Sequence, residues 1–182
     1  MKIAIHQPNF FPHYPFFQKM KEADVFVLLC HCQFEKNNYQ NRFKMNDEWF
    51  TMRVNHGLKP IIEKAYIAPT TDFDKIKLAL PEYEKLLDNF DDCMYDSLAK
   101  TNSEIIERIA YLLKIKTQIV FDYPTVLTGT ERLVHLCKNW GATTYLSGIS
   151  GIDYMDMKLF EKEDIEVLFQ QQQESKPILQ VL

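Results

Sequence analysis

Two histidines and two side-chain amides lie in one short loop near the start of the sequence. The segment HQPNFFPHYP contains His6, Gln7, Asn9 and His13 together with three prolines and no glycine. Histidine titrates near neutral pH and can act as a general base, whereas amides donate and accept hydrogen bonds. Because prolines lower the entropy that a loop loses on ordering, these side chains would be held in fixed places. We therefore expect the histidines to be catalytic, the amides to bind substrate, and the Phe and Tyr rings of the loop to stack on a base or a sugar.

A second loop, SGISGIDY, is rich in small residues and hydroxyl groups. It follows an apolar segment that ends at Leu146 and precedes a helical pattern. Free backbone N–H groups near the start of a helix suit a phosphate or another anion. Upstream, the segment YQNRF places an amide beside an arginine, which can bind phosphate in a bidentate manner that lysine cannot match. The expected substrate- or phosphate-binding residues of these two segments are Asn41, Arg42, Ser147, Gly148, Ser150, Gly151 and Tyr154.

Each of these candidates also has a purely structural explanation. His6 at the end of a strand is equally well explained as a buried, neutral, hydrogen-bonded side chain. His13 can cap the helix that follows it, and Gly and Ser form tight turns and helix caps without any ligand. Arg42 can belong to a surface ion pair, which contributes under about 1 kcal/mol. What favours a functional site is that two unusual polar loops are expected at the same edge of one sheet.

The segment LLCHCQF is the one place where the sequence suggests a metal site. If residues 25–32 form a strand, Cys30 and Cys32 face one side of it and His31 faces the other, so the three cannot bind one ion. We therefore expect no bound metal. The four cysteines are scattered, which is typical of free thiols in a reducing compartment. They are Cys30, Cys32, Cys93 and Cys137.

Composition and charge narrow the class of protein. The 182 residues suit one domain, residues 1–182, that can bury a sizeable core. The formal net charge of -4 provides no basic field, which argues against non-specific binding to nucleic acid. No apolar stretch approaches the roughly 20 residues of a membrane span, and we identify no signal peptide. We expect a cytoplasmic protein without a membrane span.

The order of apolar segments along the chain predicts an α/β fold. A short apolar run over residues 2–5, a helical pattern over residues 15–24 and a second apolar run from residue 25 predict a parallel βαβ unit. The last third of the chain alternates in the same way. Its strands are expected at residues 117–123, 143–148 and 165–170, with helices between them.

The middle of the sequence differs from this pattern. Residues 48–54 and 63–68 have the composition of strands and are expected to pair as an antiparallel excursion, whereas residues 71–116 have helical periodicity. Thr101 and Glu104 have the spacing of a capping box, which predicts a helix start at Thr101. A second capping box is expected at Thr128 and Glu131, with a C-terminal stop at Gly141.

Together these segments predict a Rossmann-like three-layer α/β sandwich. Its sheet would be mainly parallel with about five strands, and the central antiparallel and helical segment would be an insertion. Ligands bind such sheets at the carboxyl ends of their strands, so the two polar loops should meet there. The glutamine tract at residues 170–173 is expected to be exposed.

Several segments in combination resemble the WbqC family. They are IHQPNFFPHYPFFQKMKEADVFVLL, QFEKNNYQNRFKM, EWFTMRV, TYLSGISGIDYMD and LFEKEDIEVLFQ, in the order expected for that family. Members occur among genes for O-antigen and other surface polysaccharides. The resemblance implies a part in making or modifying an activated sugar, as an acyl or aminoacyl transferase. The matching positions are His6, Gln7, Pro8, Pro12, Asp24, Gln33, Asn41, Arg42, Trp49, Ser147, Gly148, Gly151 and Tyr154.

The chain departs from the family pattern in three places. Cys30 and His31 stand where the family tends to have an acidic pair, Arg53 stands where a proline is usual, and the chain ends at KPILQVL, before the tail we would expect. A weaker resemblance, to nucleotidyltransferase-type α/β proteins, concerns architecture. Their H-x-G-H motif would correspond to the segment HYPF at residues 13–16, which lacks the glycine and the second histidine.

The leading hypothesis is a transferase that acts on a nucleotide-activated sugar or its acyl donor. His6 or His13 would be the general base, and Arg42 with residues 147–151 would hold phosphate. Two alternatives stay open: a non-catalytic protein that binds a nucleotide or nucleotide-sugar, and an interaction subunit that uses an aromatic surface. The sequence does not determine the sugar, the cofactor or the oligomeric state.

Overall fold

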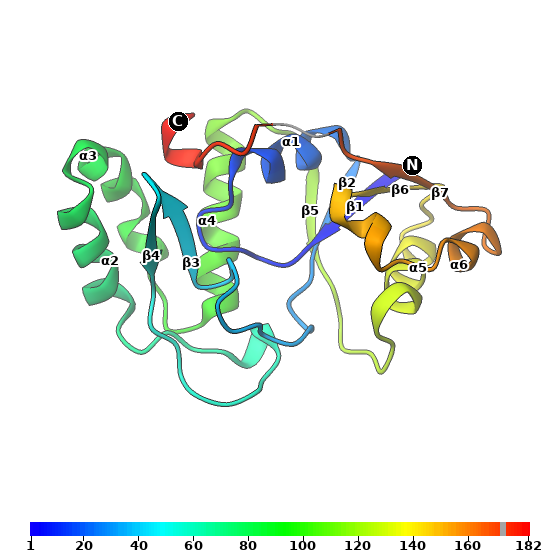
Figure 1. Cartoon of the computed structure of the whole chain (residues 1–182), viewed down its shortest axis with the longest axis horizontal. Coiled ribbons are helices and arrows are strands. Elements are labelled where there is room, and N and C mark those ends of the chain that lie inside the picture. Colours follow the sequence, from blue (N-terminus) through cyan, green and yellow to red (C-terminus); the bar gives the residue numbers. More distant parts are fainter. Residues whose placement is uncertain (172–173) are drawn as a thin grey trace.

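The computed structural model describes residues 1–171 and 174–182, so half of the glutamine tract at residues 170–173 lies outside the described residues. One sheet contains β1 (Lys2–His6), β2 (Val25–Leu28), β5 (Gln118–Phe121), β6 (Thr144–Ser147) and β7 (Glu166–Phe169). Their order across the sheet is β5-β2-β1-β6-β7, and each neighbouring pair is parallel (Figure 1). The predicted parallel sheet is therefore confirmed.

Helices cover both faces of this sheet. One layer holds α1 (Tyr14–Glu22) and α4 (Leu98–Leu112), and the other holds α5 (Gly129–Asn139) and α6 (Met157–Glu161). Along β1, Ala4 faces the first layer, whereas Ile3 and Ile5 face the second, because successive side chains of a strand point to opposite faces. The result is the three-layer α/β sandwich that the sequence predicts.

The segment between β2 and β5 is the predicted central insertion. It contains a hairpin and several helices, and in Figure 1 much of it lies beside the sheet as a separate group of elements. The last helix of the insertion, α4, returns to pack on the sheet. Its other elements are β3 (Arg42–Met45), β4 (Glu48–Thr51), α2 (Pro69–Ala79) and α3 (Glu84–Leu87), with 3-10 turns at Ile61–Glu63, Pro81–Tyr83 and Asp88–Cys93.

The antiparallel pairing inside the insertion differs from the prediction. The hairpin pairs β3 with β4, whereas we expected residues 48–54 to pair with residues 63–68. The turn consists of Asn46 and Asp47, whose φ angles of 50° and 63° match the tight turn that favours hairpins. Residues 63–68 form only isolated bridges, one of them between Val54 and Tyr66.

One predicted helix cap is wrong, and a second is right in position but lacks the capping hydrogen bond. α4 begins after Ser97, whose hydroxyl accepts a hydrogen bond from the Lys100 N–H, four residues before the expected start. Thr101 is buried inside α4 and bonds to the backbone of Tyr95. Thr128 does precede α5, but its side chain makes no capping bond. Gly141 follows the end of α5 with a φ of 62°, as the predicted stop requires.

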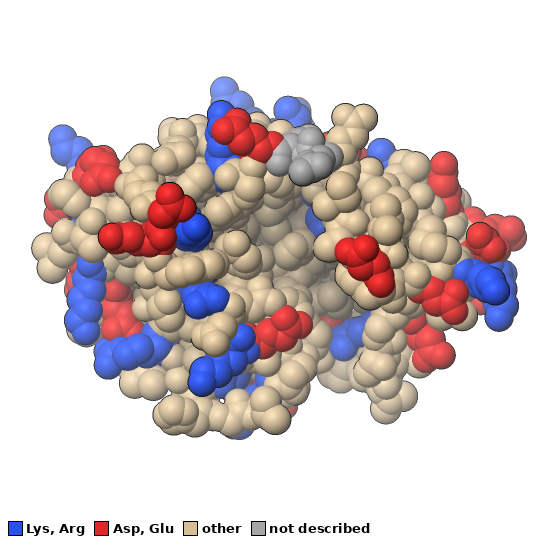
Figure 2. Space-filling model, in the orientation of Figure 1, with Lys and Arg blue, Asp and Glu red and all other residues tan. Residues whose placement is uncertain are grey.

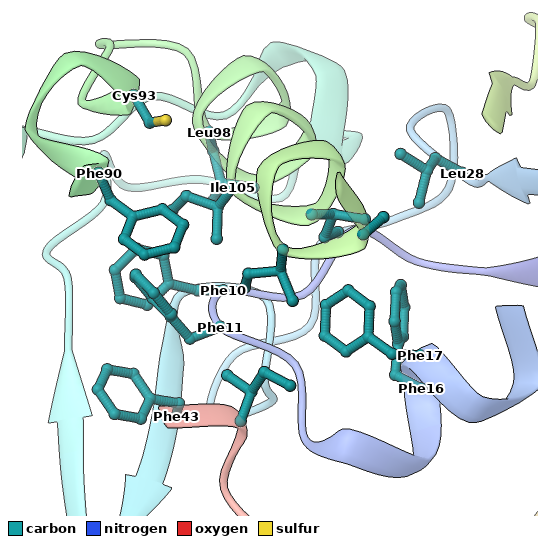
Figure 3. Packing of buried hydrophobic residues seen from close by; sticks show 14 of the residues in the cluster. Phe10, Phe11, Phe16, Phe17, Leu28, Phe43, Phe90, Cys93, Leu98 and Ile105 are labelled. Carbon is teal, nitrogen blue, oxygen red and sulfur yellow. The ribbon is translucent and has the colours of Figure 1, made fainter. Parts of the chain in front are cut away.

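The aromatic rings of the first loop lie in the core rather than at a ligand site. Phe10 and Phe11 are 0% exposed, and Figure 3 shows them beside Phe43 and Phe90. We expected the loop's rings to stack on a base or sugar, and for these two that expectation is wrong. The backbone of Phe11 has a φ of 44°, which a non-glycine residue adopts only where the surroundings hold it.

A buried asparagine fastens the same loop to α4. The side chain of Asn102 is 0% exposed and donates to the carbonyls of Pro8 and Gln40, at 2.8 and 2.7 Å. Its own oxygen accepts a hydrogen bond from the Tyr66 hydroxyl at 2.8 Å. The side chain of Gln40 continues the network by donating to Gln7 at 2.7 Å. The first loop is therefore held by apolar packing and by buried hydrogen bonds together.

Asn102→Ala should destabilise the protein substantially. The substitution leaves the Pro8 carbonyl without its partner and reduces the Gln40 carbonyl and the Tyr66 hydroxyl to the 3.4 Å hydrogen bond between them, which we expect to cost about 2–4 kcal/mol. For a chain of this size the melting temperature should fall by roughly 4–16 °C. The matched control is Asn89→Ala, because Asn89 is exposed and its side chain donates only to the nearby carbonyls of Lys85 and Leu86 among the described residues. Equal denaturation midpoints for the two variants would contradict the proposed anchoring role.

Candidate functional site

The candidate site lies where the chain reverses its order across the sheet. β1 and β6 are neighbours, and the next strands along the chain, β2 and β7, lie on opposite sides of this pair. The two strands end at His6 and Ser147, and the loops that follow them line an open cavity of about 680 Å³. Figure 2 shows this cavity as a hollow near the centre of the molecular face, with most of the charged side chains away from it. Parallel α/β sheets commonly bind ligands at such a point.

The wall of the cavity is polar but carries little charge. Among the described residues, the Lys, Arg, Asp and Glu side chains that line it are Lys19 and Glu35. The remaining polar groups are imidazoles, amides and hydroxyls, which donate and accept hydrogen bonds without adding a fixed charge. They belong to His6, His13, Gln7, Asn9, Asn38, Gln170, Tyr39, Tyr145, Tyr154, Ser147, Ser150 and Ser175.

Most of the residues that the sequence selects come together in this cavity. Three of them do not line it. Asn41 and Arg42 lie in the hairpin region, and Gly151 is buried in the turn after β6. Those that do line it are His6, Gln7, Asn9, His13, Ser147, Gly148, Ser150 and Tyr154.

Arg42 and Asn41 make structural contacts instead of facing the cavity. The guanidinium of Arg42 lies 4.0 Å from the centre of the Trp49 ring and donates a hydrogen bond to the Asn37 carbonyl. The buried side chain of Asn41 donates to the Met52 carbonyl at 2.7 Å and so ties the two strands of the hairpin together. The structure therefore does not support the phosphate-binding role predicted for Arg42.

The turn after β6 is held by a close contact between two of the selected residues. A Cβ atom added at Gly151 would lie 2.1 Å from Oγ of Ser147, so only glycine fits there. The Ser147 hydroxyl donates to the Gly148 carbonyl at 3.0 Å and is almost fully buried. Ser147 and Gly151 thus shape the turn, whereas Ser150 and Tyr154 have exposed side chains at the cavity.

His6 is poorly suited to act as a proton acceptor near neutral pH. Its Nδ1 donates a hydrogen bond to the Gln7 carbonyl at 2.9 Å, which leaves Nε2 as an acceptor in the neutral ring. Burial, and secondarily the nearby charge of Lys19, lower the pKa of His6 to about 3. A base whose pKa lies far below the working pH takes up a proton only weakly. The environment of His6 favours hydrogen bonding over general-base catalysis.

His13 has the better geometry for proton transfer. Its Nε2 faces the Lys44 carbonyl at 3.2 Å, so a neutral ring carries its hydrogen there, and Nδ1 accepts from the Ser175 hydroxyl at 2.8 Å. Burial lowers the pKa of His13, which keeps the ring neutral and able to accept a proton at pH 7. His13 precedes α1, yet its side chain makes no capping bond. The helix-cap explanation therefore does not account for this residue.

Sequence reasoning missed Lys19, which is the buried cation of the cavity. Its side chain is 3% exposed, and Nζ donates to the Ile5 carbonyl at 3.2 Å. Burial lowers the pKa of Lys19 to about 7. The sequence did indicate that Lys19 is buried, because it stands three residues after Phe16 and one before Met20, on the apolar face of α1.

The segment after β2 is organised by a buried carboxylate. Asp122 accepts hydrogen bonds from the backbone N–H of Cys30 at 2.7 Å and from Nδ1 of His31 at 3.0 Å, and it pairs with Arg132. Cys32 donates its thiol to the Leu29 carbonyl at 3.3 Å. β2 ends at Leu28, so the alternation argument that we used against a metal site does not apply. Nevertheless, no cluster of three or more His, Cys, Asp or Glu side chains suited to a metal occurs in the described residues.

Two further sequence expectations can be compared with the described residues. All four cysteines are free thiols, and burial raises the pKa of Cys30 and Cys137 to about 12. None of the helices described is both long enough and apolar enough to cross a bilayer.

Comparison with known proteins gives a family for this arrangement. The WbqC-like protein family model matches residues 7–180. The chain belongs to the WbqC-like protein family. It is 26% identical over 186 residues to the uncharacterized protein Rv1507c of Mycobacterium tuberculosis, an alignment that covers 91% of this chain and 80% of that protein. No solved structure matches the chain.

The WbqC-like match includes nearly the whole cavity wall. It begins at Gln7, one residue after the end of β1, and extends beyond Ser175. The C-terminal part of the match contributes directly, because Gln170 donates to the Pro15 carbonyl at 2.8 Å while Ser175 bonds to His13. Membership in this family therefore covers the fold and the cavity, and it assigns neither a reaction nor a substrate.

Lys19→Met should stabilise the ligand-free protein at pH 7 and below. On folding, the pKa of Lys19 falls from 10.5 to about 7, so the unfolded chain binds the proton more tightly. The free energy of unfolding therefore decreases as the pH falls from 10.5 to about 7. Each unit of this difference corresponds to about 1.4 kcal/mol, and we expect the variant to gain roughly 2–5 kcal/mol.

The gain should disappear as the pH approaches about 10, where both states hold Lys19 neutral. Urea denaturation near pH 6, 8 and 10 measures the effect. Lys21→Met, at an exposed lysine of the same helix, is the matched control and should show no such pH-dependent gain. A Lys19→Met variant that is destabilised at every pH would show that the lysine contributes to the fold.

Proposed function

We propose that the chain is a transferase that binds a nucleotide-activated sugar and takes part in surface-polysaccharide biosynthesis, by acyl or aminoacyl transfer. The observation that carries this proposal is the cavity between the ends of β1 and β6, with its weakly charged wall of imidazoles, amides and hydroxyls. A volume of about 680 Å³ falls in the usual range of small-molecule sites. Membership in the WbqC-like family is consistent with a sugar ligand through the resemblance described above.

The wall of the cavity suits the sugar part of such a ligand. A sugar presents several hydroxyl groups, each of which can donate and accept a hydrogen bond. Asn9 lines the cavity, and its buried Oδ1 accepts no hydrogen bond within the described residues, which leaves one acceptor of this side chain unused in the ligand-free protein. Tyr154 and Tyr39 add rings with polar tips at the cavity wall.

His13 is the residue best placed to move a proton in this reaction. In acyl transfer to a sugar amine or hydroxyl, the nucleophilic atom forms a bond to the acyl carbon, loses a proton, and expels the leaving group of the donor. The lone pair on Nδ1 of His13 points to the Ser175 hydroxyl, and a substrate group in the place of that hydroxyl would deliver its proton to Nδ1. The Lys44 carbonyl fixes the ring orientation through Nε2.

A binding protein without catalytic activity is the second candidate. It is favoured by one observation, which is that both ring nitrogens of His13 already have hydrogen-bond partners. Together with the low pKa of His6, this leaves neither histidine of the cavity as a free base in the ligand-free protein. Binding and turnover experiments separate the two candidates.

Filling the cavity should abolish ligand binding. Gly148 lines it with a φ of -67° and nothing within 4 Å of an added Cβ, so Gly148→Leu can adopt the native backbone and project into the cavity. In wild type, a nucleotide-sugar at 100 times its dissociation constant should add about 2.7 kcal/mol of stability, or roughly 5–11 °C. Melting scans against nucleotides, nucleotide-sugars and free sugars should show this shift, and Gly148→Leu should lose it.

The control for this experiment is Ala79→Leu, which adds the same side chain at an exposed position of α2. It should retain the full shift. If no compound of the panel stabilises wild type, the transferase proposal is contradicted and the interaction-subunit alternative gains support.

His13→Gln should reduce turnover far more than binding. Loss of a general base costs about 10²–10⁴-fold in rate, whereas glutamine keeps a polar side chain at the cavity wall. We expect kcat to fall by about that factor in a coupled assay with a nucleotide-linked amino sugar and a thioester acyl donor, while the affinity changes by less than about threefold. Binding without any turnover in wild type would instead support the non-catalytic binding protein.

A further inference from the structure

Lys19 is a buried amine that makes one hydrogen bond and lines the cavity. Its Nζ donates to the Ile5 carbonyl at 3.2 Å, and no Asp or Glu oxygen of the described residues lies within ion-pair distance of it. An ammonium group has three N–H donors, so two of them are left for a partner. A buried charge without a counter-ion is strongly unfavourable, and folded proteins rarely keep one without a use for it.

Among the described residues, the groups around Lys19 include the ring of Phe26, whose centre lies 5.8 Å from Nζ, and no carboxylate that would serve as a counter-ion. The neighbouring titratable side chain on β1 is His6, which stays neutral and hydrogen-bonds through Nδ1 to Gln7. The acidic residue of the cavity wall, Glu35, is exposed and accepts a hydrogen bond from Asn38. The other titratable groups that line the cavity are His13, Tyr39, Tyr145 and Tyr154.

We propose that Lys19 binds one negatively charged group, a carboxylate or a phosphate, carried by the sugar ligand of the cavity. This deepens the proposed function and rests on it for the identity of the ligand as a sugar. An anion at Lys19 supplies the missing counter-ion and accepts the two free N–H donors in a charge-assisted interaction. The rest of the ligand meets the uncharged amides and hydroxyls of the wall.

The proposal assigns the anion to a residue of the cavity wall, whereas the sequence had suggested Arg42. Arg42 does not line the cavity, whereas Lys19 lines it on a rigid helix packed against the sheet. One lysine matches one negative group better than a chain of several phosphates. The fixed position of Lys19 fits recognition of a charged substituent on the sugar itself.

The test compares three simple sugars that differ in one group. Glucose is the uncharged probe, glucuronate carries a carboxylate, and glucose 1-phosphate carries a phosphate. Isothermal titration calorimetry near pH 6.5 is carried out on wild type, on Lys19→Met, and on Lys21→Met as the matched exposed control. At least one charged sugar should bind wild type and the control more tightly than glucose does. Lys19→Met should weaken that binding by about 10- to 150-fold and leave glucose unchanged.

The two charged probes distinguish the two sources of the anion. Binding of glucuronate alone assigns a carboxylate, and binding of glucose 1-phosphate alone assigns a phosphate. For glucuronate, which does not titrate between about pH 6 and 9, affinity should fall toward that of Lys19→Met as the pH rises, because Lys19 loses its proton. In the same pH series, the affinity of Lys19→Met for glucuronate should not depend on pH. This comparison distinguishes an effect of Lys19 from an effect of His13.

Equal affinity of a charged sugar for all three proteins, or no preference for either charged sugar over glucose, would overturn the proposal. Failure of the proposed function has a different signature. If charged sugars bind through Lys19 but no nucleotide-sugar binds or reacts, the transferase proposal is wrong and the anion site remains. If nucleotide-sugars bind and react equally well with Lys19→Met, the transferase proposal remains and the anion site is wrong.

Discussion

The burial of Phe10 and Phe11 is the interaction on which the geometry of the cavity depends. Both residues belong to the loop after β1, and their rings are fully buried in the core between α4 and the hairpin of β3 and β4. Full burial of one such ring contributes about 1.5–3 kcal/mol. His6 lies before this anchor and His13 after it, so the path of the backbone between the two histidines is set by the rings. The loop has aromatic residues in place of glycine because it serves as an anchor as well as a connection.

Hydrogen bonds of Asn102 and Gln40 also hold this loop in place. Asn102 holds the carbonyls of Pro8 and Gln40, and Gln40 in turn holds Gln7, which lines the cavity. The carbonyls are therefore satisfied away from the cavity, and the side chain of Gln7 is fixed before any ligand arrives. A site that is ordered in advance loses less conformational entropy on binding, which favours affinity. The positive φ of Phe11 persists because both sets of contacts hold it.

The sequence predicted the sheet well because its signals were local and repeated. Runs such as VFVLLC occur only in buried strands or helices, and their order with the helical segments leaves few α/β topologies to consider. The hairpin was missed because its signal is two residues long, Asn46 and Asp47, and because residues 63–68 have strand-like composition but form only isolated bridges. The start of α4 was misplaced because Thr101 and Glu104 match a capping pattern by chance, while Thr101 is occupied by Tyr95.

The residues of the candidate site were harder to predict, because the burial and the direction of each side chain decide whether it lines the cavity. Arg42 and Lys19 illustrate the limit. Arginine is the better phosphate ligand by chemistry, but the alternation of β3 and the ring of Trp49 place Arg42 away from the cavity. Lysine on an apolar helix face interrupts the pattern, and only the packing of α1 against β1 shows that it borders a cavity.

Two buried charges in this fold show how structural and functional groups can be told apart. Asp122 lies after β5 and has its carboxylate fully engaged by Arg132, His31 and the backbone of Cys30. Its interactions are complete within the chain, and they hold the segment that follows β2. Lys19 is equally buried, but its contacts in the described residues are one carbonyl hydrogen bond and the ring of Phe26, with no carboxylate. Since both charges are costly to bury, the incomplete hydrogen bonding of Lys19 is the feature that supports the proposed anion site. The unpartnered Oδ1 of Asn9 lies at the same cavity and follows the same logic. Other buried polar atoms without a partner, such as Oγ of Ser103 and the hydroxyl of Tyr123, do not line this cavity, so a missing partner supports a ligand site only together with a position at the cavity wall.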